Sequence, residues 1–394
     1  MLQSPYPKDQ RAIMARGIVV QNQEITAQRK RIPSLDGLRA ISIILVIFDH
    51  FFMGHESGTH RSFAVKLLYA TLGNGEFGVE VFFVISGFLI TYLLLREREK
   101  NGCISLKDFY IRRFFRIFPA YYTLIAVVAI LSALGIFNAT RRDLIHAATY
   151  TWIYNFHDWN WYLAHSWSLG VEEQFYLFWP AVVAFMSLRY ARRVAFAMLL
   201  LVPAARALFP MPGSHLFHHI CYFLFAGRFD VLMCGCLAAL YWRSERLQGW
   251  LRSRYAGAIC VLALVIAFCV SSAKPFIADG LAFRTCRDSI VGIAVMALLL
   301  YVISNPKSIA GKALNFTPLA WVGTISYSLY LWQQLFLTPD STFLVQRAPF
   351  NIPLAFLAAV LSFNLIERPM VRLRERMFAE EAKSEATAPE PLTV

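Results

Sequence analysis

A cation and an imidazole share one apolar stretch near the start of the chain, IPSLDGLRAISIILVIFDH. Arg39 and His50 are eleven positions apart, and in an α-helix that spacing returns to within about 20° of the starting direction and advances about 16 Å. Both side chains therefore share one helix face. Ionisable groups at the centre of a membrane helix cost roughly 2.5–3.5 kcal/mol, so they normally face a bundle interior and mark function. The pair indicates a site that lines a buried channel.

A second basic pair, Arg113 and Arg116, lies in FYIRRFFRIFPAYY, just before a proline-started apolar segment. At a spacing of three residues the two guanidinium groups share a helix face, and their forked donors suit one phosphate group. The same residues also suit a juxtamembrane anchor under the positive-inside rule. The sequence leaves both roles open.

Two further segments place charges within apolar surroundings. In HSWSLGVEEQFYLFWP, Glu172 and Glu173 diverge by about 100° on a helix, so one carboxylate can face a lumen while the other braces a neighbouring helix. His165, in the same segment, suits either the site or the membrane interface. In GRFDVLMCG, Arg228 and Asp230 are expected to pair with other ions of the bundle, and this structural role is favoured for both.

Small residues predict close helix packing at Ser86-Gly87 and at Cys234-Gly235-Cys236. The seven cysteines are scattered without the spacing of metal ligands, so we expect no metal. The chain also has no P-loop and no dinucleotide-binding glycine motif, which disfavours an energy-driven pump.

Composition fixes the class of protein. Hydrophobic residues make up 57% of the chain and charged residues 16%, and the mean hydropathy is +0.49. Such a chain is an all-α polytopic membrane protein, and we expect about ten transmembrane helices around a polar central cavity or channel. The expected spans lie near residues 40–54, 78–95, 117–136, 167–187, 193–209, 219–241, 255–272, 287–304, 318–337 and 348–366.

Most of the 38 Lys and Arg residues fall in the two terminal segments and in connections on one face. The positive-inside rule therefore places both termini in the cytoplasm. The net charge of +13 needs no nucleic-acid partner, because it reflects topology and contact with membrane lipids. We expect residues 1–31 to be a mobile basic cytoplasmic arm, 32–369 to be the transmembrane domain, and 370–394 to be a largely disordered cytoplasmic tail after a helix end near Pro369.

Taken in order, the segments resemble the acyltransferase-3 family of integral membrane acyltransferases. The matching elements are LDGLRA with Arg39 and His50, GVEVFFVISGFLI, FYIRRFFRIFP, HSWSLGVEEQFYLFWP, GRFDVLMCG, SYSLYLWQQ and IERP. Many family members have a histidine where this chain has Gln333, so we expect no acid–base role at that position. Some members also carry an extracytoplasmic hydrolase-like domain, which we do not expect in this chain.

The resemblance implies transfer of an acyl group, most often acetyl, from cytoplasmic acyl-coenzyme A to a hydroxyl of a sugar, glycan or lipid-linked glycan in the bacterial inner membrane. Arg39, Arg113 and Arg116 would hold the phosphates of the donor. His50 would be the general base or the acyl-carrying nucleophile, and Glu173 would orient an imidazole or the acceptor hydroxyl. The candidate substrate-binding residues are Asp49, His165, Trp167, Glu172, Arg228 and Asp230.

Two features of this assignment stay open at the level of sequence. Trp152, Trp159, Trp161 and Trp167 suit stacking on sugar rings, although an aromatic belt at the membrane surface is the commoner explanation. Buried Arg, His and Glu residues would also suit a transporter or flippase of a lipid-linked or exported glycan, although no inverted repeat is visible in the sequence.

Overall fold

The computed structural model describes residues 32–53, 72–155, 160–208, 228–272, 281–339 and 341–387, with side chains left undescribed at 281–284 and 381–387. The predicted N-terminal arm, Cys221 and Trp159 lie outside these residues. Within them every regular element is helical, which confirms the predicted all-α class. The long elements are α2 (Leu35–Met53), α4 (Gly75–Asn101), α5 (Leu106–Ala133), α8 (Ser166–Phe185), α9 (Leu188–Leu208), α11 (Phe229–Tyr241), α13 (Ala256–Ser272), α15 (Leu281–Ser304), α18 (Ser326–Phe336), α19 (Asn351–Ser362) and α20 (Arg368–Thr387).

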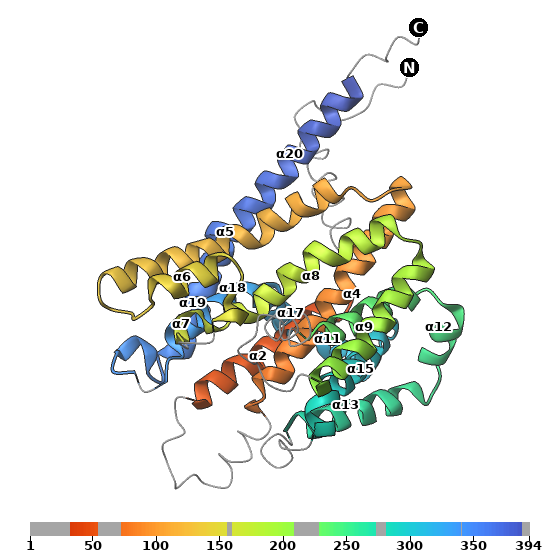
Figure 1. Ribbon diagram of the computed structural model, residues 1–394, viewed down its shortest axis with the longest axis horizontal. Coiled ribbons are helices and arrows are strands. Elements are labelled where there is room, and N and C mark those ends of the chain that lie inside the picture. The colour runs from red at the N-terminus through yellow and green to blue at the C-terminus, as the bar shows by residue number, and fades with distance from the viewer. Residues whose placement is uncertain are drawn as a thin grey trace, which may run out of the picture.

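Shorter elements join the long helices. They are α6 (Arg141–Ala148), η1 (Trp152–Tyr154), α7 (Trp161–Ala164), α12 (Glu245–Leu251), α16 (Ile309–Leu314), α17 (Thr317–Thr324), η2 (Leu344–Gln346) and the π-helical turn η3 (Phe363–Glu367). Figure 1 shows α2 and α4 in the middle of the bundle, α13 and α15 on one side of it, and α5 beside α20 on the other.

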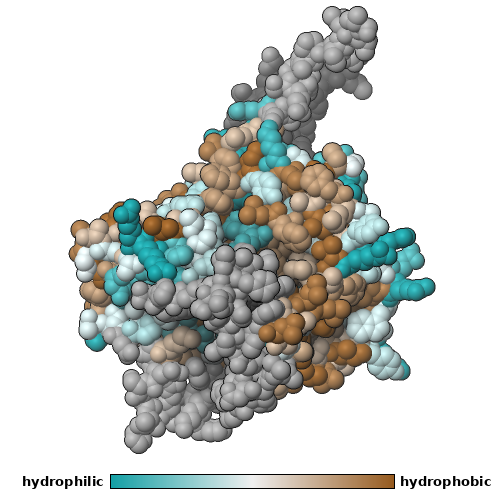
Figure 2. Space-filling model, viewed as in Figure 1, coloured by the Kyte–Doolittle hydropathy of each residue, from teal (hydrophilic) through white to brown (hydrophobic). Residues whose placement is uncertain are grey.

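The bundle has a polar interior and an apolar exterior. Glu80 and Asp230 are completely buried, whereas Leu200, Val261 and Leu365 are 71%, 60% and 70% exposed. Figure 2 shows brown apolar residues spread over the outer surface of the helices. This inversion is what a hydrocarbon solvent requires, because exposed apolar side chains contact lipid while ions are satisfied inside. The chain is therefore an integral membrane protein.

The described parts of the expected spans coincide with helices or helix pairs, although residues 219–227 lie outside the described chain. The count of about ten is not confirmed. Among the described residues, four helices are long and apolar enough to cross a membrane, or five if the bent pair α12–α13 is one span. Helices α2 and α8, which carry the predicted site, fall outside this set. The expected span 318–337 is divided into α17 and α18 at Ile325.

The C-terminal segment differs from its prediction. Helix α20 continues to Thr387, so the expectation of disorder is wrong for residues 370–387. Residues 388–394 lie outside the described chain. The wider π turn η3 precedes Pro369, whose missing N–H cannot complete a regular helical hydrogen bond. This turn lets α19 pass into α20 without the helix end that we expected there.

Helices α4 and α11 approach each other very closely, as the small residues predicted. A Cβ atom on Gly87 would lie 2.1 Å from the carbonyl oxygen of Leu232, and one on Gly235 would lie 2.0 Å from that of Val84. Both distances are impossible contacts, so only glycine allows this approach. The neighbouring Cys234 and Cys236 are buried free thiols, in agreement with a packing role.

We predict that Gly235→Ala destabilises the protein by about 1–3 kcal/mol or more, because the added methyl group overpacks a backbone contact. Gly249→Ala is the matched control, since a Cβ there meets nothing within 4 Å in helix α12. Thermal unfolding of the two purified variants in detergent measures the difference. Equal unfolding midpoints would show that the α4–α11 contact has room to relax.

Candidate functional site

Three cavities follow one another along α2. The first, here called the basic cavity, has a volume of about 480 Å³ and lies between the start of α2 and α20. Its charged lining consists of Asp36, Arg39, Arg116, Glu367, Arg368, Arg372 and Arg374. Five arginines therefore face two carboxylates, which makes the cavity suitable for a polyanion.

The second, the middle cavity, has a volume of about 100 Å³ and shares Arg39 and Arg116 with the basic cavity. Arg113 also lines it, with its guanidinium carbon 4.8 Å from the centre of the Tyr176 ring. The spacing of Arg113 and Arg116 thus brings both guanidinium groups to the same space as Arg39. The rest of the lining is mostly apolar, so a thin, largely uncharged chain fits this cavity best.

The third, the histidine cavity, has a volume of about 530 Å³ and is lined by five of the predicted site residues: Asp49, His50, His165, Trp167 and Arg228. It shares Val79 and Tyr330 with the middle cavity. Helix α2 therefore carries Arg39 at one end of this series of cavities and His50 at the other. The shared helix face expected for this pair is confirmed.

The His50 ring is held in a defined orientation. Its Nδ1 lies 2.8 Å from Oε1 of Gln333, and the indole ring of Trp161 contacts it edge-on at 5.3 Å between ring centres. An amide oxygen can only accept, so in this orientation of the Gln333 amide the Nδ1 atom carries the hydrogen and Nε2 is the acceptor nitrogen. The amide at position 333 thus sets the tautomer of His50 and needs no proton chemistry of its own.

The two carboxylates of α8 lie away from the histidines. Glu172 and Glu173 both line the middle cavity, where the Ser86 hydroxyl donates a 2.6 Å hydrogen bond to Glu172. Glu173 was expected to orient an imidazole, but the histidines at positions 50 and 165 are hydrogen-bonded to glutamines instead. Both carboxylates lie beside arginines, so they balance the positive charge of the middle cavity.

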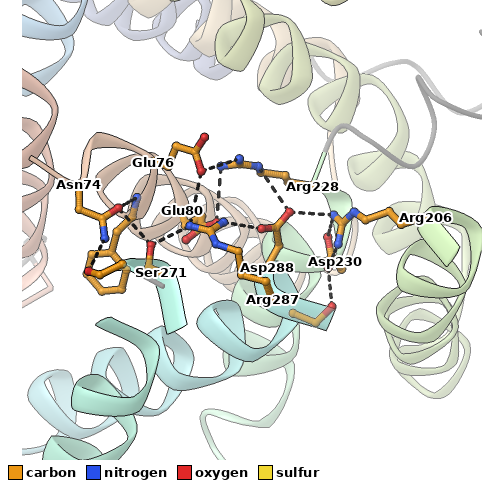
Figure 3. A network of polar contacts seen from close by, with 12 residues as sticks. Asn74, Glu76, Glu80, Arg206, Arg228, Asp230, Ser271, Arg287 and Asp288 are labelled. Atoms are coloured by element: carbon orange, nitrogen blue, oxygen red, sulfur yellow. Dashed lines mark hydrogen bonds and ion pairs between the residues drawn. The ribbon is translucent and has the colours of Figure 1, made fainter. Parts of the chain in front are cut away.

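A network of ions supports one wall of the histidine cavity (Figure 3). The Arg228 guanidinium group lies 3.4 Å from Glu76, 3.5 Å from Glu80 and 3.6 Å from Asp288, and its other face covers the ring of Trp167 at 5.3 Å. Arg228 also has a left-handed backbone, with φ of 52°, which is strained for a residue with a side chain. The network fixes the side chain at the cavity wall despite this strain.

Asp230 belongs to the structural part of the network. Its carboxylate accepts two hydrogen bonds from Arg206, at 2.8 and 2.9 Å, and one from Ser289 at 2.5 Å. It lines none of the three cavities, unlike Arg228. The ion pairing that we expected for Asp230 is confirmed, and its candidate role in substrate binding has no geometric support.

Several residues of the site were not identified from the sequence. The paired amides of the motif LYLWQQ were a visible signal, because two glutamines inside an apolar helix require partners. A disordered tail after residue 369, as the sequence predicts it, gives Arg372 and Arg374 no place in the site. Neither sugar stacking nor an aromatic belt predicts the contact of Trp161 with His50, whereas Trp152 and Trp167 line the histidine cavity as sugar stacking requires.

The arrangement supports one kind of chemistry. Arginines at one end can hold phosphates, the middle cavity can admit a thin arm, and an imidazole with a free Nε2 can act as a base or a nucleophile at the other end. Acyl transfer from a long phosphate-bearing donor uses all three features.

Comparison with known proteins also indicates an acyltransferase. A family model described as an acyltransferase domain matches residues 32–366. The chain is 32% identical over 376 residues to the peptidoglycan O-acetyltransferase OatA of Listeria monocytogenes, covering 87% of this chain and 56% of the relative.

Two more relatives are 29% identical over 379 residues, covering 88% of this chain: the putative peptidoglycan O-acetyltransferase YrhL of Bacillus subtilis, of which 56% is covered, and the O-acetyltransferase OatA of Staphylococcus aureus, of which 58% is covered. The chain thus spans little more than half the length of these relatives. No solved structure shows a significant match.

We predict that Asp230→Ala lowers stability by roughly 3–5 kcal/mol, because it leaves the buried Arg206 cation without its bidentate partner. Ser289→Ala, which removes only one hydrogen bond to the same carboxylate, should cost about 1 kcal/mol. Folded yield and thermal unfolding in detergent measure both effects. A stable Asp230→Ala protein with a selective loss of acceptor binding would restore Asp230 to the substrate site.

Proposed function

We propose, because the chain belongs to the acyltransferase family, that it transfers an acyl group from cytoplasmic acyl-coenzyme A to a hydroxyl of a glycan acceptor. Acetyl is the acyl group that we propose, since the relatives are named O-acetyltransferases. The observation that carries the proposal is the succession of three cavities along α2, with arginines at one end and His50 at the other.

The donor enters at the basic cavity. Coenzyme A carries several phosphate charges, and Arg39 and Arg116 together with Arg368, Arg372 and Arg374 offer forked donors to them. The pantetheine arm then passes through the middle cavity beside Arg113, which brings the thioester toward Tyr330 and the histidine cavity. The proposed phosphate-binding site, here called the clamp, therefore includes three arginines of α20 as well as the arginines that the sequence predicts.

The acceptor binds in the histidine cavity. Trp152 and Trp167 provide ring faces for a sugar, and Arg228 and Glu76 provide polar groups for its hydroxyls. Two of the relatives carry peptidoglycan in their names, which supports a glycan acceptor for this chain. The reacting hydroxyl is then placed near Nε2 of His50, where the imidazole acts as base or as acyl carrier.

His50→Gln should reduce acyl transfer by about 10² or more, because the variant loses a group that accepts a proton or an acyl group. The assay is transfer of radiolabelled acetyl from acetyl-coenzyme A to a glycan acceptor by purified protein. His146→Gln is the matched control, since His146 lies on α6 with Nδ1 near Thr151 and lines none of the three cavities. A wild-type protein that binds both substrates without turnover would favour the alternative that the protein is a transporter or flippase.

Replacing both Arg372 and Arg374 by Ala should weaken binding of a non-hydrolysable coenzyme A analogue at least tenfold, since a hydrogen bond to a charged group contributes about 1.5–3 kcal/mol. Arg376→Ala, also on α20 but exposed and outside the cavity lining, should bind normally. Titration in neutral detergent separates this effect from binding to anionic lipid. Equal affinities for the two variants would limit the clamp to the arginines of α2 and α5.

We also propose that both termini and the end of α4 are cytoplasmic, with α6 on the opposite side. Single cysteines at Lys100 and Arg142, two exposed positions, test this in a protein without native cysteines. An impermeant maleimide should label only position 142 in intact spheroplasts. Labelling of position 100 alone would invert the topology and remove the cytoplasmic donor from the basic cavity.

A further inference from the structure

Two histidines, not one, face the histidine cavity, and consecutive residues of α18 hold them. Gln333 bonds to Nδ1 of His50, and Gln334 bonds through Oε1 to Nδ1 of His165 at very short range. His50 comes from α2, and His165 precedes α8. A single turn of α18 therefore sets the orientation of two imidazoles that come from distant parts of the chain.

The same tautomer results at both rings. Because an amide oxygen accepts only, each Nδ1 carries the hydrogen and each Nε2 keeps its lone pair. His165 is only 2% exposed, and its Nε2 has no hydrogen-bond partner within the described part of the chain. A buried polar atom without a partner costs about 1–3 kcal/mol. Since His165 lines the 530 Å³ cavity, a ligand bound there is the nearest source of a partner for this buried atom.

The Gln334 side chain is itself fixed. Its Oε1 also accepts the backbone N–H of His165 at 3.1 Å, and its backbone carbonyl accepts the Trp161 indole N–H at 3.1 Å. The Tyr330 hydroxyl donates to the backbone carbonyl of His165 at 3.1 Å. These contacts leave the His165 ring little freedom to change its orientation.

A covalent mechanism needs a second base. If His50 carries the acyl group on Nε2, that atom is occupied and cannot remove the proton of the acceptor hydroxyl. A direct transfer, with His50 as the base, would need no other imidazole. We propose that the two histidines divide the reaction: His50 Nε2 accepts the acyl group, and His165 Nε2 accepts the proton of the acceptor hydroxyl.

The steps balance as follows. Nε2 of His50 attacks the thioester carbonyl, the carbon–sulfur bond breaks, and the coenzyme A thiolate leaves while Nδ1 keeps its hydrogen toward Gln333. The acceptor oxygen then attacks the acyl-imidazolium carbon as His165 Nε2 takes the hydroxyl proton, and the carbon–nitrogen bond breaks. The proton on His165 passes through water to the thiolate, so the products are an ester and a thiol.

This inference rests on the proposed function, and an experiment on the wild-type protein tests the inference and the proposed function separately. With acetyl-coenzyme A and no acceptor, rapid-mixing detection of free thiol should show a burst near one equivalent per protein. Acceptor-dependent transfer without such a burst would overturn the inference and leave the proposed function intact. Absence of any acyl transfer would overturn the proposed function itself.

The variants His165→Gln and His165→Asn test whether His165 accepts the proton of the acceptor hydroxyl. Each should keep the thiol burst and the affinity for a coenzyme A analogue, while transfer to the acceptor falls about 10²-fold. His50→Gln should lose both the burst and the transfer, and the control His146→Gln should lose neither. Transfer at the wild-type rate by a His165 variant, or loss of the burst together with transfer in a variant that still binds the analogue, would overturn the assignment.

Discussion

Charge in a membrane bundle must be matched by other charge, and this constraint organises the protein. Two arginines and four carboxylates from α4, α9, α11 and α15, together with Arg228 just before α11, form a connected set inside the bundle: Glu76, Glu80, Arg206, Arg228, Asp230, Arg287 and Asp288. Arg287 lies 2.6 Å from both Glu80 and Asp288, so the set connects helices that are distant in sequence. Removing one member leaves an ion that neither lipid nor apolar side chains can satisfy.

In the basic cavity, by contrast, the charges are not matched. Along the basic cavity five arginines face only two carboxylates, so positive charge remains available to a ligand. This excess is open to an anionic ligand, because Arg368 and Arg372 are exposed and the cavity supplies only two carboxylates. The same bundle therefore holds one set of three arginines paired with four carboxylates, which positions Arg228, and a second set with excess arginines, which can bind a donor. The difference between the two sets is the physical basis for assigning structure to one and binding to the other.

Sequence reasoning succeeded where the signal was local. Apolar length located the helices, helical spacing placed Arg39 and His50 on one face, and glycine flanked by small residues predicted the close approach at Gly87 and Gly235. It failed where the partner lies on another helix, as with the glutamines that hold His50 and His165. Neutral amides carry no charge signal, and no periodicity links position 50 to position 333. The charge-rich composition after Pro369 suits an exposed helix as well as a disordered chain, so it did not separate the two.

Helix α2 also acts as a fixed spacer between donor recognition and chemistry. Arg39 and His50 belong to one uninterrupted helix, so their axial separation of about 16 Å cannot change without breaking it. On the proposed function, a donor must place its phosphates at one end of this spacer and its acyl carbon at the other. An acyl phosphate, in which the two groups are adjacent, cannot reach both ends, whereas a thioester on a long arm can. The geometry of one helix thus selects the class of donor before any contact with the acyl group is made.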